Sequence, residues 1–101
     1  MSSPAIQIIL NSDGTTSFSP SPQTALVSDL AFWNNQTKEN HWPWPTDSNY
    51  TPQATGWFPS AVPPGETSGD FATPVSAQTV YYCCKLHPKE RGIINVVNSL
   101  P

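Results

Sequence analysis

The segment YYCCKLHPKERG, residues 81–92, contains a cysteine, a histidine and a glutamate at three-residue intervals. Cys84, His87 and Glu90 offer a thiolate, an imidazole and a carboxylate, which are all common metal ligands. A thiolate with two imidazoles is the ligand set of trigonal copper sites and of some zinc sites. His41 is the chain's only other histidine, so it is the one candidate for the second imidazole.

The same residues also have an interpretation without a metal. In that interpretation His87 is exposed in a loop, Cys84 is a small buried side chain, and Glu90 is solvated beside Lys89 or Arg91. Cys-x-x-His is a weak pattern by itself, so the spacing alone leaves both interpretations open.

Composition indicates one small β domain. The 101 residues, taken as a single domain 1–101, include 12 prolines and only 11% charged residues, which suits short strands and many turns. A net charge of −3 without a basic stripe argues against a nucleic-acid partner. No apolar run is long enough for a membrane span, and MSSPAIQIIL does not read as a secretion signal. We therefore expect either a cytosolic protein or a mature, processed domain.

The two cysteines are neighbours and cannot link distant strands by a disulfide. Along TVYYCC, residues 79–84, the period of two puts Val80, Tyr82 and Cys84 on one, more apolar face. Cys83 is expected to point outward, so a single metal ion would use Cys84. A redox disulfide between the two is disfavoured because an extended backbone separates their sulfurs.

Alternating apolar residues and turn signals predict about seven to eight short strands and no helix beyond a turn or two. Such a pattern is typical of a β-sandwich. A long irregular stretch is expected from 35 to 64, and loops of that length tend to be functional. The expected strands lie at 6–10, around 18, within 24–34 on both sides of a turn at 28–29, within 65–73, at 78–84 and at 92–98.

Residues 81–96 resemble the last strand, loop and strand of the cupredoxins, the family of small blue copper proteins. The family pattern there is aromatic-x-Cys-x-x-His-Pro-x-Met-x-Gly-x-Ile-x-Val, and its short, amicyanin-like loop is the closest form. The matching residues are Tyr82, Cys84, His87, Pro88, Gly92, Ile94 and Val96.

The resemblance extends upstream and covers nearly the whole chain. DLAFWNNQTKENH, residues 29–41, is similar to the family's strand that ends in Asn and is followed by the first copper-ligating His. VPPGETSGDF, residues 62–71, is similar to the Pro-Gly turn and strand that precede the Cys strand. The upstream matches are Asp29, Trp33, Asn34, Asn35 and His41.

This resemblance implies an all-β, Greek-key β-sandwich that binds one type 1 copper ion per chain through His41, Cys84, His87 and Glu90. It implies an electron carrier and not an enzyme, because no histidines remain for a second metal centre. It also implies a monomer located in the periplasm or outside the cell, which exchanges electrons with a redox partner protein.

Glu90 stands where the family carries its axial methionine, and Asn40 stands where a proline usually precedes the first ligand. Methionine is a soft, neutral ligand, whereas a carboxylate is hard and anionic. A bound Glu90 would therefore favour the cupric ion and lower the reduction potential. The alternative is that Glu90 turns outward to Lys89 or Arg91 and leaves the axial position without a protein ligand.

The family's docking surface surrounds the exposed edge of the second histidine. Three of the chain's four basic residues would lie there, so we expect an acidic partner whose association is accelerated by electrostatic steering. The alternative for Trp42 or Trp44 is a role as a buried plug under the long loop. The expected docking residues are Trp42, Trp44, Lys85, Leu86, Pro88 and Lys89.

Two other functions fit the same residues. The site could hold copper or zinc for delivery or structure without redox cycling. It could also be a catalytic centre in which a labile Glu90 opens a coordination position to a small molecule. Electron transfer is the interpretation that the family resemblance favours.

Overall fold

The computed structural model describes residues 3–100, which form eight strands and no helix. The all-β prediction of seven to eight strands is confirmed. None of the described residues forms a helix that could cross a membrane. The strands are β1 (Ala5–Leu10), β2 (Thr16–Ser19), β3 (Gln23–Leu26), β4 (Leu30–Asn35), β5 (Pro43–Thr46), β6 (Phe71–Ala72), β7 (Gln78–Cys84) and β8 (Arg91–Val97).

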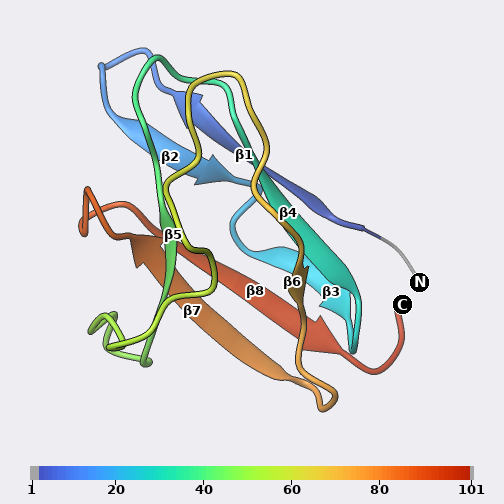
Figure 1. Cartoon of the computed structure of the whole chain (residues 1–101). Coiled ribbons are helices and arrows are strands. Elements are labelled where there is room, and N and C mark those ends of the chain that lie inside the picture. Colours follow the sequence, from blue (N-terminus) through green and yellow to red (C-terminus); the bar gives the residue numbers. More distant parts are fainter. Residues whose placement is uncertain (1–2, 101) are drawn as a thin grey trace.

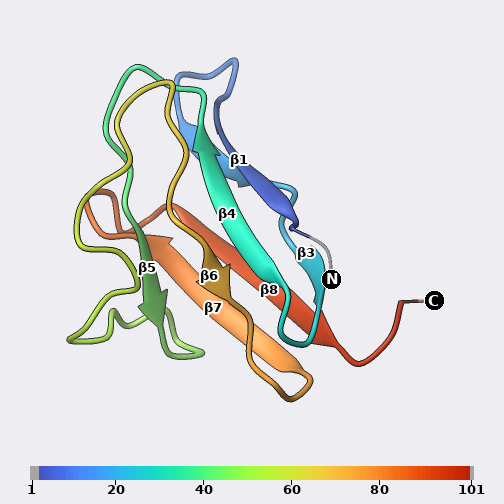
Figure 2. The ribbon, with the colours of Figure 1, turned by 45° about the vertical axis from the view of Figure 1, so that its right-hand side comes forward.

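The strands form two four-stranded sheets that pack as a sandwich (Figures 1 and 2). The order is β2-β1-β4-β6 in the first sheet and β3-β8-β7-β5 in the second. The β1–β4 and β3–β8 pairs are parallel, and the other pairs are antiparallel. The loop between β7 and β8 lies at one end of the sandwich, and the start of β1 and the end of β8 lie toward the other (Figure 1).

The core lies between the sheets and is built from alternating residues of the strands. Trp33 and Tyr82, both fully buried, meet edge to face with their ring centroids 5.2 Å apart. Phe18 also packs against Tyr82, with ring centroids 4.8 Å apart. The buried members of the core are Ile6, Ile8, Phe18, Ala25, Ala31, Trp33, Tyr82, Cys84, Ile94 and Val96.

The β7–β8 hairpin requires a glycine at position 92. Tyr82 and Gly92 are directly opposite in the hairpin, and the Tyr82 ring lies across β8 at that point. A Cβ atom at position 92 would lie 2.2 Å from Cζ of Tyr82 and 2.3 Å from its hydroxyl oxygen. The absent side chain therefore lets the ring reach the core beside the loop that carries His87 and Glu90.

Two expectations need correction. The stretch 35–64 is not irregular throughout, because it contains β5, which pairs with β7. Cys83 is on the face of β7 opposite to the core, as predicted, but it is fully buried. Trp44 of β5 is its partner in register and is itself only 7% exposed. In the segment after β5, Tyr50 packs on Tyr81 and the Gln53 carbonyl accepts from the Trp44 indole, so this segment covers the face. Strand alternation contains no information about contacts of this kind.

Candidate metal centre

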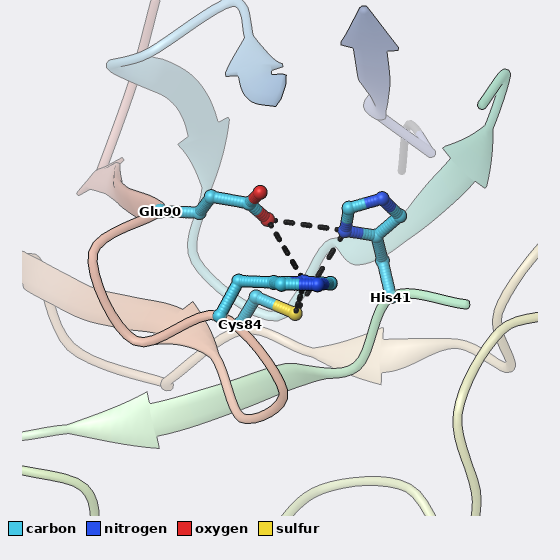
Figure 3. Close-up of side chains that lie close together, drawn as sticks. His41, Cys84 and Glu90 are labelled. Carbon is cyan, nitrogen blue, oxygen red and sulfur yellow. Dashed lines mark hydrogen bonds and ion pairs between the residues drawn. The ribbon is translucent and has the colours of Figure 1, made fainter. Parts of the chain in front are cut away.

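Four potential metal ligands from two separate parts of the chain lie together at one end of the sandwich. The donor atoms of His41, Cys84, His87 and Glu90 all lie within 4.8 Å of one another. Cys84 is the last residue of β7, and His87 and Glu90 belong to the loop that follows it. His41 lies just before β5, and Figure 3 shows its ring facing the Cys84 thiol and the Glu90 carboxylate.

The distances fit a single ion between the donors. The Cys84 sulfur is 3.8 Å from Nδ1 of His41 and 3.5 Å from Nδ1 of His87. Ligand bonds of about 2.3 Å to sulfur and about 2.0–2.1 Å to nitrogen place the two atoms about 3.5–3.8 Å apart at tetrahedral or trigonal angles. Both imidazoles therefore present Nδ1 at a separation from the sulfur that a shared metal ion would produce.

Glu90 is turned toward the same point. Its Oε1 is 3.0 Å from Nδ1 of His41 and 3.7 Å from Nδ1 of His87. Its Oε2 accepts a hydrogen bond from the hydroxyl of Thr16. Within residues 3–100 the carboxylate forms no ion pair with Lys89 or Arg91, so the outward orientation is not the one observed.

The loop 85–90 holds its donors by backbone hydrogen bonds. The amide of His87 donates to the carbonyl of Cys84 at 3.2 Å, and the amide of Glu90 donates to the carbonyl of His87 at 2.9 Å. The amide of Cys84 donates to the carbonyl of Glu90 at 2.9 Å. Backbone hydrogen bonds therefore link Cys84, His87 and Glu90 to one another. These bonds explain how such a short segment can direct three side chains to one point.

Asn35, at the end of β4, organises the segment that carries His41. Its amide nitrogen donates to the carbonyls of Glu39 at 2.7 Å and Val62 at 3.0 Å. Its amide oxygen accepts from the backbone and hydroxyl groups of Thr37 at 2.9 and 2.7 Å. Val62 in turn exchanges two backbone hydrogen bonds with His41. The buried asparagine thus fixes the position of His41 through Val62.

The four candidate ligands differ in solvent exposure, which separates the buried ligands from the one that reaches the surface. His41 and Cys84 are fully buried, whereas the side chains of Glu90 and His87 are 14% and 38% exposed. Nε2 of His41 is buried without a hydrogen-bond partner among the described residues. His87 is therefore the most exposed of the four and connects the cluster to the surface, where its Nε2 lies 3.6 Å from a carboxylate oxygen of Glu39.

The environment of the Cys84 thiol suits a protected ligand. Burial raises the pKa of Cys84, and the backbone N–H groups of Trp42, Leu86 and His87 oppose that rise. The Trp42 amide donates to the sulfur at 3.3 Å. Because the thiolate is the metal-binding form, a metal ion must displace the proton that burial favours.

The expected docking residues surround the exposed edge of His87 unequally. Leu86 is 47% exposed, and Pro88 and Lys89 are also exposed. Trp42 is half-buried, and its indole N–H donates to the carbonyl of Phe58 at 3.2 Å.

Trp44 lies beneath this surface and not on it. Its indole N–H donates to the carbonyl of Gln53 at 2.7 Å, and its ring lies against Gly56. The Lys85 ammonium lies 3.9 Å from the centroid of the Trp44 ring and 5.0 Å from that of Trp42. These contacts are close enough for cation–π attraction, so Lys85 covers both indoles.

Sequence reasoning did not identify Thr16, Glu39 or a structural role for Asn35. Thr16 is 74 residues from Glu90, and no local pattern relates the two. Asn35 had a signal, because a polar residue at the end of an otherwise apolar strand requires hydrogen-bond partners if it is buried.

The chain matches no family model and no curated protein sequence. Its structure is similar to a purple cupredoxin from Nitrosopumilus maritimus, with a TM-score of 0.80 and 18% identity over 93% of this chain and 99% of that chain. It is also similar to a mutant amicyanin in its reduced Cu(I) form at pH 4, with a TM-score of 0.71 and 18% identity over 94% of this chain and 82% of that chain. A second reduced amicyanin mutant gives a TM-score of 0.72 at 17% identity, with the same coverage.

Proposed function

We propose that this chain, which has the cupredoxin fold, binds one copper ion through His41, Cys84, His87 and Glu90 and carries single electrons between proteins. The observation that carries the proposal is the convergence of these four donors, with two of them buried and the His87 ring reaching the surface. Thiolate, imidazole and carboxylate together form a ligand set that a copper ion accepts.

Copper, when bound, supplies a one-electron Cu(II)/Cu(I) couple. Electron transfer requires that the ligands hold nearly the same positions in both oxidation states. His41 and Cys84 meet this requirement because they are fully buried and held by backbone hydrogen bonds. The short hydrogen-bonded loop 85–90 restrains the backbone of His87 and Glu90.

His87 would connect the centre to a partner protein. Its partly exposed ring has Leu86 and Pro88 as exposed chain neighbours, which offer an apolar contact, and the exposed Lys89 that follows Pro88 offers a positive charge. We propose that a redox partner with an acidic surface docks here and that the protein works as a monomer. A carrier with these features suits the periplasm or the exterior of the cell, and fractionation of the native host would test that location.

Glu90 supports a second candidate function. Carboxylates also bind zinc, and a hard ligand stabilises the cupric state more than the cuprous state. A site of this kind would store or deliver copper or zinc without redox cycling.

Metal titration with two cysteine variants tests the proposed ligands. Adding Cu(II) should give one bound ion per chain and a strong thiolate-to-copper charge-transfer band. Cys84→Ser should abolish this band because it removes the thiolate, whereas Cys83→Ser should retain most of it because Cys83 lies on the opposite face of β7. Loss of the band in Cys83→Ser alone would contradict the assignment of Cys84.

Voltammetry separates the two functions. A carrier should show a reversible one-electron wave and keep its copper through repeated cycles. Release of copper on each reduction, or zinc binding as tight as copper binding with no reversible wave, would support storage or delivery instead.

A further inference from the structure

Thr16 joins the metal cluster from the opposite sheet. It is the first residue of β2, which pairs with β1 in the sheet that does not contain Cys84. Its hydroxyl donates to Oε2 of Glu90, so this hydrogen bond crosses between the two sheets at the end of the sandwich where the cluster lies. The proposed copper-binding set does not include Thr16.

The two oxygens of Glu90 have separate partners. Oε1 faces the imidazoles, at 3.0 Å from His41 and 3.7 Å from His87, while Oε2 is held by Thr16. A carboxylate bound in this way can present only one of its oxygens to the cluster, and its orientation depends on the hydroxyl behind it.

Glu90 also has room to turn away. An open groove of about 920 Å³ runs beside the Thr16–Glu90 contact and includes both residues in its wall. A glutamate side chain that can rotate into such a space loses rotamer freedom when it is fixed in one orientation. The groove is lined by the end of β1, the β1–β2 loop and the start of β2, by residues 36–39 after β4, and by residues 87–90 of the β7–β8 loop.

We propose that Thr16 is a positioning residue, whose hydroxyl holds the Glu90 carboxylate against the metal centre and prevents it from rotating into the groove. This inference rests on the proposed function because it assigns Thr16 a role toward the metal that His41, Cys84, His87 and Glu90 would bind. The residue that would control the orientation of Glu90 therefore lies on β2, which is distant in sequence from the loop that carries Glu90.

Replacement of the hydroxyl tests the proposal. Thr16→Val keeps the volume and the β-branched shape but removes the donor. Its affinity for Zn²⁺, measured by competition with a chelator, should fall about 10–100-fold, which is the usual effect of losing a partner that orients a metal ligand. The Cu(II) absorption spectrum should shift toward that of Glu90→Ala.

Two variants provide controls. Thr16→Ser keeps the hydroxyl and should retain the native affinity and spectrum. Ser17→Ala removes a neighbouring hydroxyl in the same groove wall that donates to Asn11 instead of Glu90, so it should leave both readouts unchanged. If Thr16→Val does not fold, as judged by circular dichroism of the metal-free protein, the comparison of Thr16→Ala with Thr16→Ser decides the same question.

A double substitution separates positioning from a general structural effect. In a Glu90→Ala background, Thr16→Val should cause no further change in Zn²⁺ affinity, because the carboxylate that it positions is gone. An equal loss in both backgrounds, or native affinity and spectrum in Thr16→Val, would overturn the proposal. Failure of the native protein to form a thiolate-to-copper band would instead contradict the proposed function, and the Zn²⁺ measurement would still decide the role of Thr16.

Discussion

Glu90 has a position that its neighbours in the sequence do not explain. Lys89 and Arg91 flank it, yet its carboxylate faces His41 and Thr16. Arg91 lies instead over the ring of Tyr50, 4.8 Å from its centroid, where cation–π attraction engages its charge. Arg91 therefore interacts with Tyr50 and not with Glu90, and the Glu90 carboxylate points toward the buried side of the loop.

Glu90→Met should raise the reduction potential of the copper-loaded protein. A soft neutral thioether replaces a hard anion, so the preference for Cu(II) over Cu(I) decreases. A tenfold to hundredfold loss of that preference corresponds to a rise of about 60–120 mV for a one-electron couple. Voltammetry checks the potential, and the absorption spectrum should move toward that of an ordinary blue copper site.

Glu90→Gln should give a potential between those of the native protein and Glu90→Met, because an amide oxygen is neutral but hard. Glu66→Met is the matched control, since it removes an exposed carboxylate that is not in the metal cluster. A potential that Glu90→Met leaves unchanged would show that the carboxylate does not bind the metal.

At the scale of the elements, the β7–β8 hairpin links core packing to the metal centre. The Tyr82–Gly92 pair is followed directly by the Cys83–Arg91 pair and then by the loop with the candidate ligands. Any shift of the two strands at Tyr82 therefore moves Cys84 relative to His87 and Glu90.

Gly92→Ala should destabilise the metal-free protein by about 1–3 kcal/mol, the usual cost of forcing an extra methyl group into a packed core. The Tyr82 ring cannot move aside easily because Phe18 and Trp33 pack against it. Urea unfolding measures the loss of stability. Gly69→Ala is the control, because its added methyl would meet only the Phe58 ring at 3.8 Å, and a native-like stability of Gly92→Ala would contradict the steric argument.

The elements also show what sequence can and cannot predict. Alternation located β1 and β7 because Ile6, Ile8 and Tyr82 face the core at every second position. It missed β5, whose Pro43 and Pro45 read as a loop. Proline is tolerated there because β5 is an edge strand, which a single sequence does not reveal.

Some residues of the candidate site could likewise be predicted from the sequence, and others could not. The three-residue spacing brought Cys84, His87 and Glu90 into consideration because one short loop carries His87 and Glu90 and Cys84 directly precedes it. His41 was the one candidate for the second imidazole because the chain has no other histidine, and the family resemblance placed it at a ligand position. Thr16 and the cover over Cys83 depend on contacts between segments that are distant in sequence, and no local pattern encodes such contacts.

At the scale of the whole molecule, charge is distributed unevenly. The chain carries a net charge of −3, while Lys85, Lys89 and Arg91 all lie in or next to the β7–β8 loop. Lys85 and Arg91 lie over aromatic rings, so they contribute to the local positive potential from fixed positions. Under the proposed function, such an asymmetry would orient an acidic partner toward His87 and would affect the rate of association more than the affinity.

The stability of the whole metal-free molecule should fall as the pH rises above about 8.5, where thiols of the unfolded chain ionise. Burial raises the pKa values of Cys83, Cys84 and Tyr82, so the folded state keeps protons that the unfolded state loses. The stabilisation from these groups is therefore complete below the unfolded pKa and is lost as the pH rises toward the folded one. Each thiol contributes a slope of at most about 1.4 kcal/mol per pH unit.

Urea unfolding of the reduced, metal-free protein from pH 7 to pH 10 measures this slope. Cys84→Ser should make it shallower, because a serine hydroxyl does not ionise in this range while the general effect of rising negative charge stays the same. In the copper-loaded protein the Cys84 contribution should have the opposite sign below about pH 8.5 and vanish above it, because the bound metal keeps that sulfur deprotonated in the folded state while the unfolded thiol still takes up a proton. Equal slopes for the native protein and Cys84→Ser would show that the Cys84 thiol ionises in the folded state as readily as in the unfolded chain.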